Sequence, residues 1–353
     1  MVQLLNLTAV LALASFASAQ CGSGTPNARV TGSSGNYQAV RGSTNLYSGG
    51  DYRAAIQAAV DGIGAGQRVS VIASGSIGAS TITIGSGKTF EGCGTINVSN
   101  RSGRGAIESL NTQGVNIPFL TMTGNPYFGL RFYGTRDLTL GRITMNLSGG
   151  MGIRFDRDQA ANSNVKMDVI NVTGAGSHAV ETWNIAGLTI NSVIARNVGE
   201  SGLLIQQVTD ARVGLVDGNN VGGGTGYATL RFANNAGQKG SSYNTNIIVD
   251  RVISRGGGRG VFCVSQSGGV EIGTVDLAQN GGNSILIENC YNFRIRGGTV
   301  NGGGEVRLAA RTEFPVTRDT NISLRVDGTT VRESPCATNS IWNLSGNGAR
   351  NIC

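Results

Sequence analysis

The sequence is poor in several residue types on which catalytic and recognition sites often depend. Its 353 residues include one histidine, two tryptophans and five prolines, and only 14% are charged. It has no Cys-x-x-Cys spacing, arginine-rich arm or aromatic RNA-binding strand, which argues against a zinc finger and a nucleic-acid partner. Beyond residue 20 no apolar run is long enough to span a membrane, so we expect no membrane association.

Glycine is abundant, with 56 residues, and Asn, Ser and Thr supply most of the polar side chains. With its many β-branched residues, this composition is too apolar for a disordered chain. The net charge of +7 and the pI near 9.3 indicate a mild preference for anionic partners, although such a charge also serves solubility alone. An anionic polysaccharide is the natural extracellular candidate.

The N-terminus has the layout of a secretory signal. Residues 4–16 form a short apolar run, and the small residues Ala17-Ser18-Ala19 follow it. We therefore predict a signal peptide over residues 1–19, a mature chain from Gln20 and a secreted, extracellular protein. The mature chain also carries Asn-x-Ser/Thr sequons, which predict a glycoprotein: Asn97, Asn100, Asn146, Asn171, Asn321 and Asn343.

The six cysteines form an even set, which in an oxidising compartment predicts three disulfides rather than a metal site. Sequence proximity favours pairing Cys263 with Cys290 and Cys336 with Cys353. Cys21 then remains to tie the N-terminus to Cys93.

One short segment has helical periodicity. In residues 51–60, DYRAAIQAAV, the apolar positions recur at helical spacing, and no second segment does this. A series of short Val/Ile/Leu strands follows, broken by Gly, Asn and Asp. We expect one helix that caps the N-terminal end of an otherwise all-β protein.

The strands repeat. One five-residue segment recurs every 21 to 31 residues, a period typical of solenoids: 129–133, 152–156, 179–183, 202–206, 229–233, 260–264, 284–288 and 305–309. Its second and fourth residues are nearly all apolar and should point into the coil. We predict a single solenoid domain over residues 20–353, with about eight to ten turns spanning residues 68–330 and a disulfide-tied tail over 331–353.

A short helix, a strand pair reading TITIGSGKTFEGCGTI and then stacked repeats resemble the pectin-lyase-like superfamily over about residues 45–330. The resemblance implies a right-handed parallel β-helix. That superfamily includes pectate lyases, polygalacturonases and phage adhesins, so the fold does not fix the activity. The polygalacturonase motifs Asn-Thr-Asp, Asp-Asp and Gly-His-Gly are absent, although Arg294-Ile295-Arg296 resembles their Arg-Ile-Lys. Asp156 and Asp158 alone offer too few ligands for a calcium site, so no cofactor is predicted.

The third residues of the repeats should form one outward row, and the fifth residues a second row beside it. His178 and Arg259 occupy the turn just before this strand. From these positions we select His178, Glu181, Arg154 and Asp156 as candidate catalytic residues. The candidate substrate-binding residues are Arg131, Tyr133, Trp183, Arg231, Arg259 and Arg307.

Two chemistries fit these rows. In β-elimination on a uronic-acid polymer, Arg154 and Arg231 would neutralise the sugar carboxylate and His178 would accept the proton. In inverting hydrolysis, Asp156 and Glu181 would be the two carboxylates. Elimination is slightly preferred because arginines outnumber carboxylates. We predict a monomeric enzyme that cleaves an acidic cell-wall polysaccharide of the pectin type. A non-catalytic wall-binding or host-interaction protein, or a merely solubilising salt-bridged ladder, remains an alternative.

Overall fold

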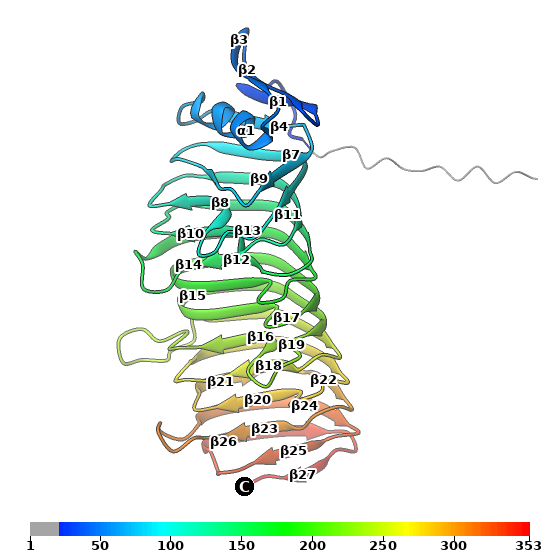
Figure 1. Ribbon diagram of the computed structural model, residues 1–353. Helices are drawn as coiled ribbons and strands as arrows, with labels where there is room; N and C mark the ends of the chain where they lie inside the picture. Colours follow the sequence, from blue (N-terminus) through cyan, green and yellow to red (C-terminus); the bar gives the residue numbers. More distant parts are fainter. Residues whose placement is uncertain (1–20) are drawn as a thin grey trace, which may run out of the picture.

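The computed structural model describes residues 21–353, so the predicted signal peptide over residues 1–19 lies outside it. The described chain is a right-handed parallel β-helix of about 12 turns, more than the eight to ten expected from the sequence. The turns are stacked along one axis, as Figure 1 shows. The one helix among these residues, α1, is Tyr52–Asp61, and no helix there is long and apolar enough to cross a membrane.

The N-terminal end of the coil is covered by α1 and by a three-stranded antiparallel element that the sequence did not reveal (Figure 1). Its strands are β1 (Ala28–Ser33), β2 (Asn36–Arg41) and β3 (Thr44–Gly49). The helix begins where the Asp51 side chain accepts a hydrogen bond from the Ala54 amide. Its buried face is the one that the helical spacing predicts, with Ile56 fully buried. This assembly closes the apolar end of the coil.

The recurrent segment forms one stack of parallel strands along the whole coil. The pairing aligns Arg131 with Arg154, Arg154 with Glu181, and Glu181 with Leu204, which is the predicted register. The strands of this stack are β6 (Ile82–Thr83), β8 (Gly105–Leu110), β10 (Phe128–Tyr133), β12 (Met151–Phe155), β14 (Val180–Val198), β15 (Leu203–Val221), β16 (Ala228–Ala233), β18 (Arg259–Cys263), β20 (Ile285–Glu288), β23 (Val306–Ala309), β25 (Thr330–Glu333) and β27 (Ala349–Asn351).

The other faces of the coil are built by a second set of parallel strands, into which β14 and β15 continue. These strands are β4 (Arg68–Val71), β5 (Gly75–Gly78), β7 (Thr89–Val98), β9 (Asn116–Gly124), β11 (Thr139–Leu147), β13 (Asn162–Thr173), β17 (Ile247–Arg255), β19 (Gly268–Ala278), β21 (Tyr291–Ile295), β22 (Gly298–Asn301), β24 (Arg318–Asp327) and β26 (Thr338–Ser345). Parallel pairing of β24 with β26 and of β25 with β27 carries the coil past residue 330, into the segment expected to be a tail.

The core lies inside the coil, where side chains of successive turns stack. Leu130 and Phe132, the second and fourth residues of their segment, are fully buried, and the Phe132 ring lies 5.2 Å from that of Phe155. This confirms the predicted inward face. The third and fifth residues therefore face outward.

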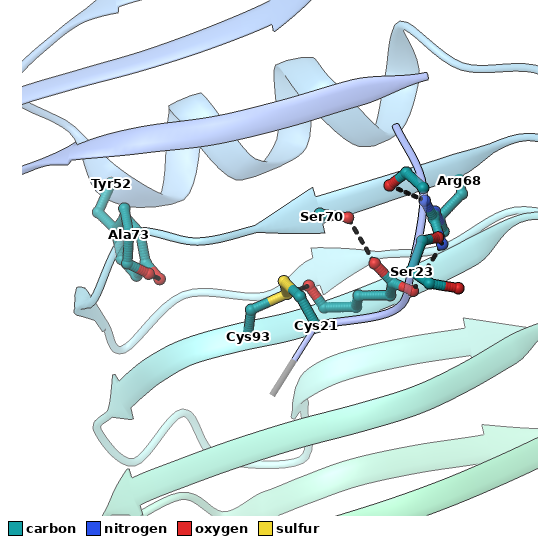
Figure 2. Close-up of a disulfide and its surroundings, with 9 residues drawn as sticks. Cys21, Ser23, Tyr52, Arg68, Ser70, Ala73 and Cys93 are labelled. Carbon is teal, nitrogen blue, oxygen red and sulfur yellow. Dashed lines mark hydrogen bonds and ion pairs between the residues drawn. A yellow bond between two sulfur atoms is a disulfide. The ribbon is translucent and has the colours of Figure 1, made fainter. Parts of the chain in front are cut away.

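All six cysteines are paired, and the pairs are those predicted: Cys21 with Cys93, Cys263 with Cys290, and Cys336 with Cys353. Around the first disulfide, Arg68 donates to the backbone oxygens of Ser23 and Gly24, as Figure 2 shows for Ser23. These bonds fasten the N-terminal segment to the first turn.

The Cys336–Cys353 disulfide lies beside Glu333 at the C-terminal end of the coil. The buried Glu333 carboxylate accepts hydrogen bonds from the Ala337 amide at 2.8 Å and from the Trp342 indole at 3.0 Å. The C-terminal segment is therefore held against the coil by both a covalent and a polar contact.

Candidate functional site

The outward row begins as a ladder of alternating charges. Arg131 contacts Glu108 at 3.1 Å and Asp156 at 2.6 Å. Arg154 contacts Asp156 at 3.0 Å and also forms an ion pair with Glu181. The Glu108 side chain is fully buried, and the others are no more than 18% exposed. Both arginines are thus saturated by carboxylates of the protein itself.

Burial alone would raise the pKa of Glu108, but hydrogen bonds outweigh it. The donors are Arg104, the backbone amide of Gly105 and Arg131, and the net effect is a lowered pKa. This carboxylate therefore stays ionised, which makes Glu108 a fixed anchor of the ladder.

The ladder ends at Glu181, which is held by neutral donors as well. The Trp183 indole and the Gln206 amide each donate to its Oε1 at 2.8 Å. Trp183 is only 7% exposed and Arg157 lies 5.8 Å over its ring, so the indole is not an open platform for a sugar. The Tyr133 ring is likewise partly covered by Arg131, at 5.6 Å.

A second polar cluster lies in the turns that precede β14, β15 and β16. The Nε2 atom of His178 lies 3.1 Å from the Glu200 carboxylate, and the Ser201 amide donates to His178 Nδ1 at 3.0 Å. Ser177 also donates to Glu200. The Tyr227 ring meets the His178 ring edge to face at 5.7 Å. Glu200 raises the pKa of the Tyr227 phenol, first through hydrogen bonding.

These contacts fix the protonation of the cluster. Burial lowers the pKa of His178, opposed by the charges of Glu181 and Glu200, so the imidazole is neutral at neutral pH. Because Nδ1 accepts an amide hydrogen, the ring proton resides on Nε2 and points to Glu200. Neither ring nitrogen then has a free lone pair. Tyr227, with its raised pKa, keeps its phenolic proton.

Beyond Tyr227, two arginines lack carboxylate partners. Arg231 and Arg259 lie 5.4 and 4.7 Å from the centre of the Phe262 ring. Burial lowers the pKa of both side chains, although an arginine remains charged at any physiological pH. Within residues 21–353, Arg231 Nε has no hydrogen-bond partner, and Arg259 donates only to the Asn283 amide oxygen and the Thr225 carbonyl. Within the described chain, neither guanidinium is therefore paired with a carboxylate.

Hollows flank the His178–Glu200–Tyr227 cluster on both sides. On the side of the early turns lies the aromatic hollow, lined by Asn100, Tyr127, Phe128, Gly150, Met151 and Ser177. On the side of the later turns lies the glycine hollow, lined by Gly223, Gly224, Thr225, Gly257, Gly258, Arg259, Gly281 and Gly282. A Cβ on Gly258 would lie 1.7 Å from the Gly222 carbonyl, so only glycine permits this close packing of turns.

The structure therefore divides the predicted residues into two groups. Arg131, Arg154, Asp156 and Glu181 form the ladder with Trp183. His178, Arg231 and Arg259 belong to the second cluster, whereas Arg307 lies further along the coil, beside Glu305 and the Ser334 carbonyl. The sequence interpretation missed Glu200 and Tyr227. Each lies four residues before the outward-row residue of its own repeat, as Ser177 does. An alignment of the turns as well as the strands would therefore have identified them.

Among the described residues, no cluster of metal-ligating side chains accompanies this site. Within residues 21–353 the one close group of Cys, His, Asp and Glu side chains is Cys21, Glu91 and Cys93. Its two sulfurs form a disulfide and are not available as thiolate ligands.

The titration of His178 should be measurable in the folding equilibrium. The unfolded chain takes up a proton below about pH 6.5, whereas the buried imidazole stays neutral further down because its pKa is lowered. More protons bound in the unfolded state mean that the free energy of unfolding falls as pH drops from about 7 to about 5. Since the chain has one histidine, His178→Gln should remove this part of the slope. Urea unfolding at both pH values checks this; an unchanged slope would contradict it.

No protein-family model matches the chain, and neither does any curated protein. Among solved structures, the A-module of mannuronan C-5 epimerase AlgE4 from Azotobacter vinelandii is similar, with a TM-score of 0.65 and 16% identity over 86% of this chain and 93% of that one. The A-module of epimerase AlgE6 from the same organism gives a TM-score of 0.47 and 14% identity, covering 86% of this chain and 94% of the other. The first likeness establishes a shared parallel β-helix fold.

Proposed function

We propose that this protein is secreted and, as a monomer, acts on a uronic-acid polysaccharide by removing the proton next to the sugar carboxylate. The observation that carries the proposal is the pair Arg231 and Arg259, two half-buried cations without a carboxylate partner in the described chain, beside a Tyr–Glu–His cluster. A uronate carboxylate matches the guanidinium fork. The similar AlgE4 module is part of an epimerase of mannuronan, which supports an acidic polymer, and three disulfides support secretion. We also infer membership of the pectin-lyase-like superfamily.

The reaction needs a neutralised carboxylate and a group that takes a carbon-bound proton. Arg231 and Arg259 would stabilise the negative charge that moves onto the carboxylate when the adjacent C–H bond breaks. The Tyr227 oxygen would accept this proton while its own phenolic proton passes to Glu200. His178 donates to Glu200 and positions it, rather than taking the proton itself.

Two outcomes follow from the same first step. In elimination, the electron pair of the broken C–H bond forms a C=C bond and the glycosidic oxygen departs with a proton from Tyr227. The proton held by Glu200 then returns to Tyr227. In epimerisation, solvent gives a proton to the opposite face of the carbon, Glu200 releases its proton to solvent, and the chain stays intact. Elimination remains our preferred outcome over hydrolysis, because arginines outnumber carboxylates in the outward row.

Hydrolysis by Asp156 and Glu181 is less well supported. Every group that contacts these two carboxylates is a hydrogen-bond donor: Arg131, Arg154, Trp183 and Gln206. An inverting hydrolase needs one of its two carboxyls protonated, and a protonated acid here would face donors only.

Incubation with a panel of pectic, mannuronic and glucuronic polymers in deuterated water tests the proposal. We expect absorbance of an unsaturated uronate together with new reducing ends. Deuterium incorporated without cleavage would also support proton removal, as epimerisation. New reducing ends without either signal would overturn it in favour of hydrolysis. Binding without any reaction would leave a wall-binding protein.

A further inference from the structure

The aromatic hollow lies directly beside the His178–Glu200–Tyr227 cluster. Ser177, in its lining, donates to Glu200. Phe128, also in its lining, has the Arg154 guanidinium 5.6 Å from the centre of its ring. Through Ser177 the hollow therefore adjoins Glu200, the residue that takes the phenolic proton in the proposed function.

The character of this hollow differs from that of the arginine side. Its six lining residues, Asn100, Tyr127, Phe128, Gly150, Met151 and Ser177, include no charged side chain. Tyr127 is 40% exposed, which is rare among the large apolar side chains of residues 21–353, and its ring meets Phe128 at 4.6 Å, edge to face. The nearby Arg154 is committed to Asp156 and Glu181. A ligand here meets the exposed Tyr127 ring, one amide and one hydroxyl.

The hollow and the free arginines lie along one edge of the strand stack. From β12 to β18 there are four strand steps, through β14, β15 and β16. At about 4.8 Å for each step, the distance along the coil is about 19 Å. A polysaccharide held at one end by Arg231 and Arg259 would have to extend about this far, past Tyr227, to reach the aromatic hollow.

We propose that the aromatic hollow is a saccharide subsite that binds a sugar of the substrate chain through its ring face and hydroxyls rather than through its carboxylate. The exposed Tyr127 ring, against which Phe128 packs edge to face, supplies the apolar surface, and Asn100 and Ser177 supply the hydrogen bonds. This inference rests on the proposed function. It adds a specificity: the sugar at this subsite need not be ionised, so a methyl-esterified or neutral residue is accepted there, whereas the arginine end requires a carboxylate.

Calorimetric titration of a turnover-deficient Tyr227→Phe protein with oligogalacturonates and oligomannuronates of two and six residues tests the subsite. When Tyr127→Ala is added to this protein, the affinity for whichever hexamer binds should fall about tenfold. The affinity for the corresponding dimer should change less than twofold. The loss should be the same at low and high salt, because no charge is involved. Arg259→Gln should instead weaken both lengths and do so most at low salt. Ile341→Ala, at a side chain that is 49% exposed on β26, is the matched control and should have no effect.

The outcomes separate the two proposals. If no oligouronate binds the parent protein, the proposed function fails, and the subsite with it. If the hexamer binds but Tyr127→Ala leaves its affinity unchanged, the subsite alone is overturned. Asn100 is also a sequon residue, and its own glycan is the competing occupant. If Asn100→Gln strengthens hexamer binding by the secreted protein, that glycan fills the hollow and the subsite proposal is overturned.

Discussion

Tyr227→Phe should lower turnover on the uronic polymer about a thousandfold while the protein still folds and still binds its substrate. The substitution keeps the ring that packs against His178 at 5.7 Å and beneath Arg231 at 6.0 Å, and it removes only the phenolic hydroxyl group. Acid–base groups contribute about a hundredfold to ten-thousandfold to a rate. A loss in kcat with little change in KM is the expected result, because the phenol acts on the transition state.

Tyr243→Phe is the matched control for this variant. Tyr243 is a tyrosine of similar burial whose ring packs against Tyr291, away from the cluster, and its substitution should not alter kcat. Exchange of the substrate's carbon-bound hydrogen with deuterated water gives a second readout, since it should be lost together with turnover. If Tyr227→Phe retains more than a tenth of the parent kcat, Tyr227 does not take the proton.

The register of the outward row could be predicted from the sequence because a strand alternates its faces and each turn of the coil repeats the same segment. Arg131, Arg154 and Glu181 are therefore neighbours, as expected. The same alternation identified the buried residues Leu130 and Phe132. The regular geometry of the strands is enough to place these residues, whatever the conformation of the turns.

The cluster in the turns could not be predicted in this way. The turns differ in length, and alternation does not fix the direction of a side chain outside a strand. Tyr227 follows the glycine-rich turn 222–226, and Glu200 follows a different and shorter one. Only the stacking of turns brings both to His178. The antiparallel strands β1 to β3 were missed for a related reason, because they stand outside the repeat that guided the prediction.

Two arginines at equivalent positions of the row have different surroundings, and we therefore propose different roles for them. Arg154 lies beside Glu181 and two residues before Asp156, so carboxylates of the protein saturate it. Arg231 lies between Leu204 and Phe262 in the strand register and has no such neighbour. From the sequence alone, both arginines are predicted to bind a sugar carboxylate. In the structure Arg231 is available for that role, and Arg154 holds the ladder together.

Arg154→Met should therefore lower the free energy of unfolding by about 3 kcal/mol, the low end of the cost of breaking a buried ion pair. Methionine replaces the apolar stem of the arginine but lacks the charged guanidinium, so the buried Asp156 and Glu181 carboxylates, 10% and 8% exposed, lose a shared counter-ion. Arg131, Trp183 and Gln206 still donate to these carboxylates, which limits the loss. Urea unfolding near neutral pH provides the measurement.

Arg212→Met is the control, because the Arg212–Asp250 pair is 64% and 48% exposed. Such a surface pair is worth at most about 1 kcal/mol. Turnover of the folded Arg154→Met protein, measured well below its unfolding midpoint, should fall less than tenfold. The sequence-based hypothesis that Arg154 and Glu181 are catalytic makes the opposite prediction, a loss of about a hundredfold in turnover at unchanged stability. That result would assign catalysis to the ladder instead of the His178–Glu200–Tyr227 cluster. The reason is that an interaction that matters only in the transition state leaves the folding equilibrium unchanged.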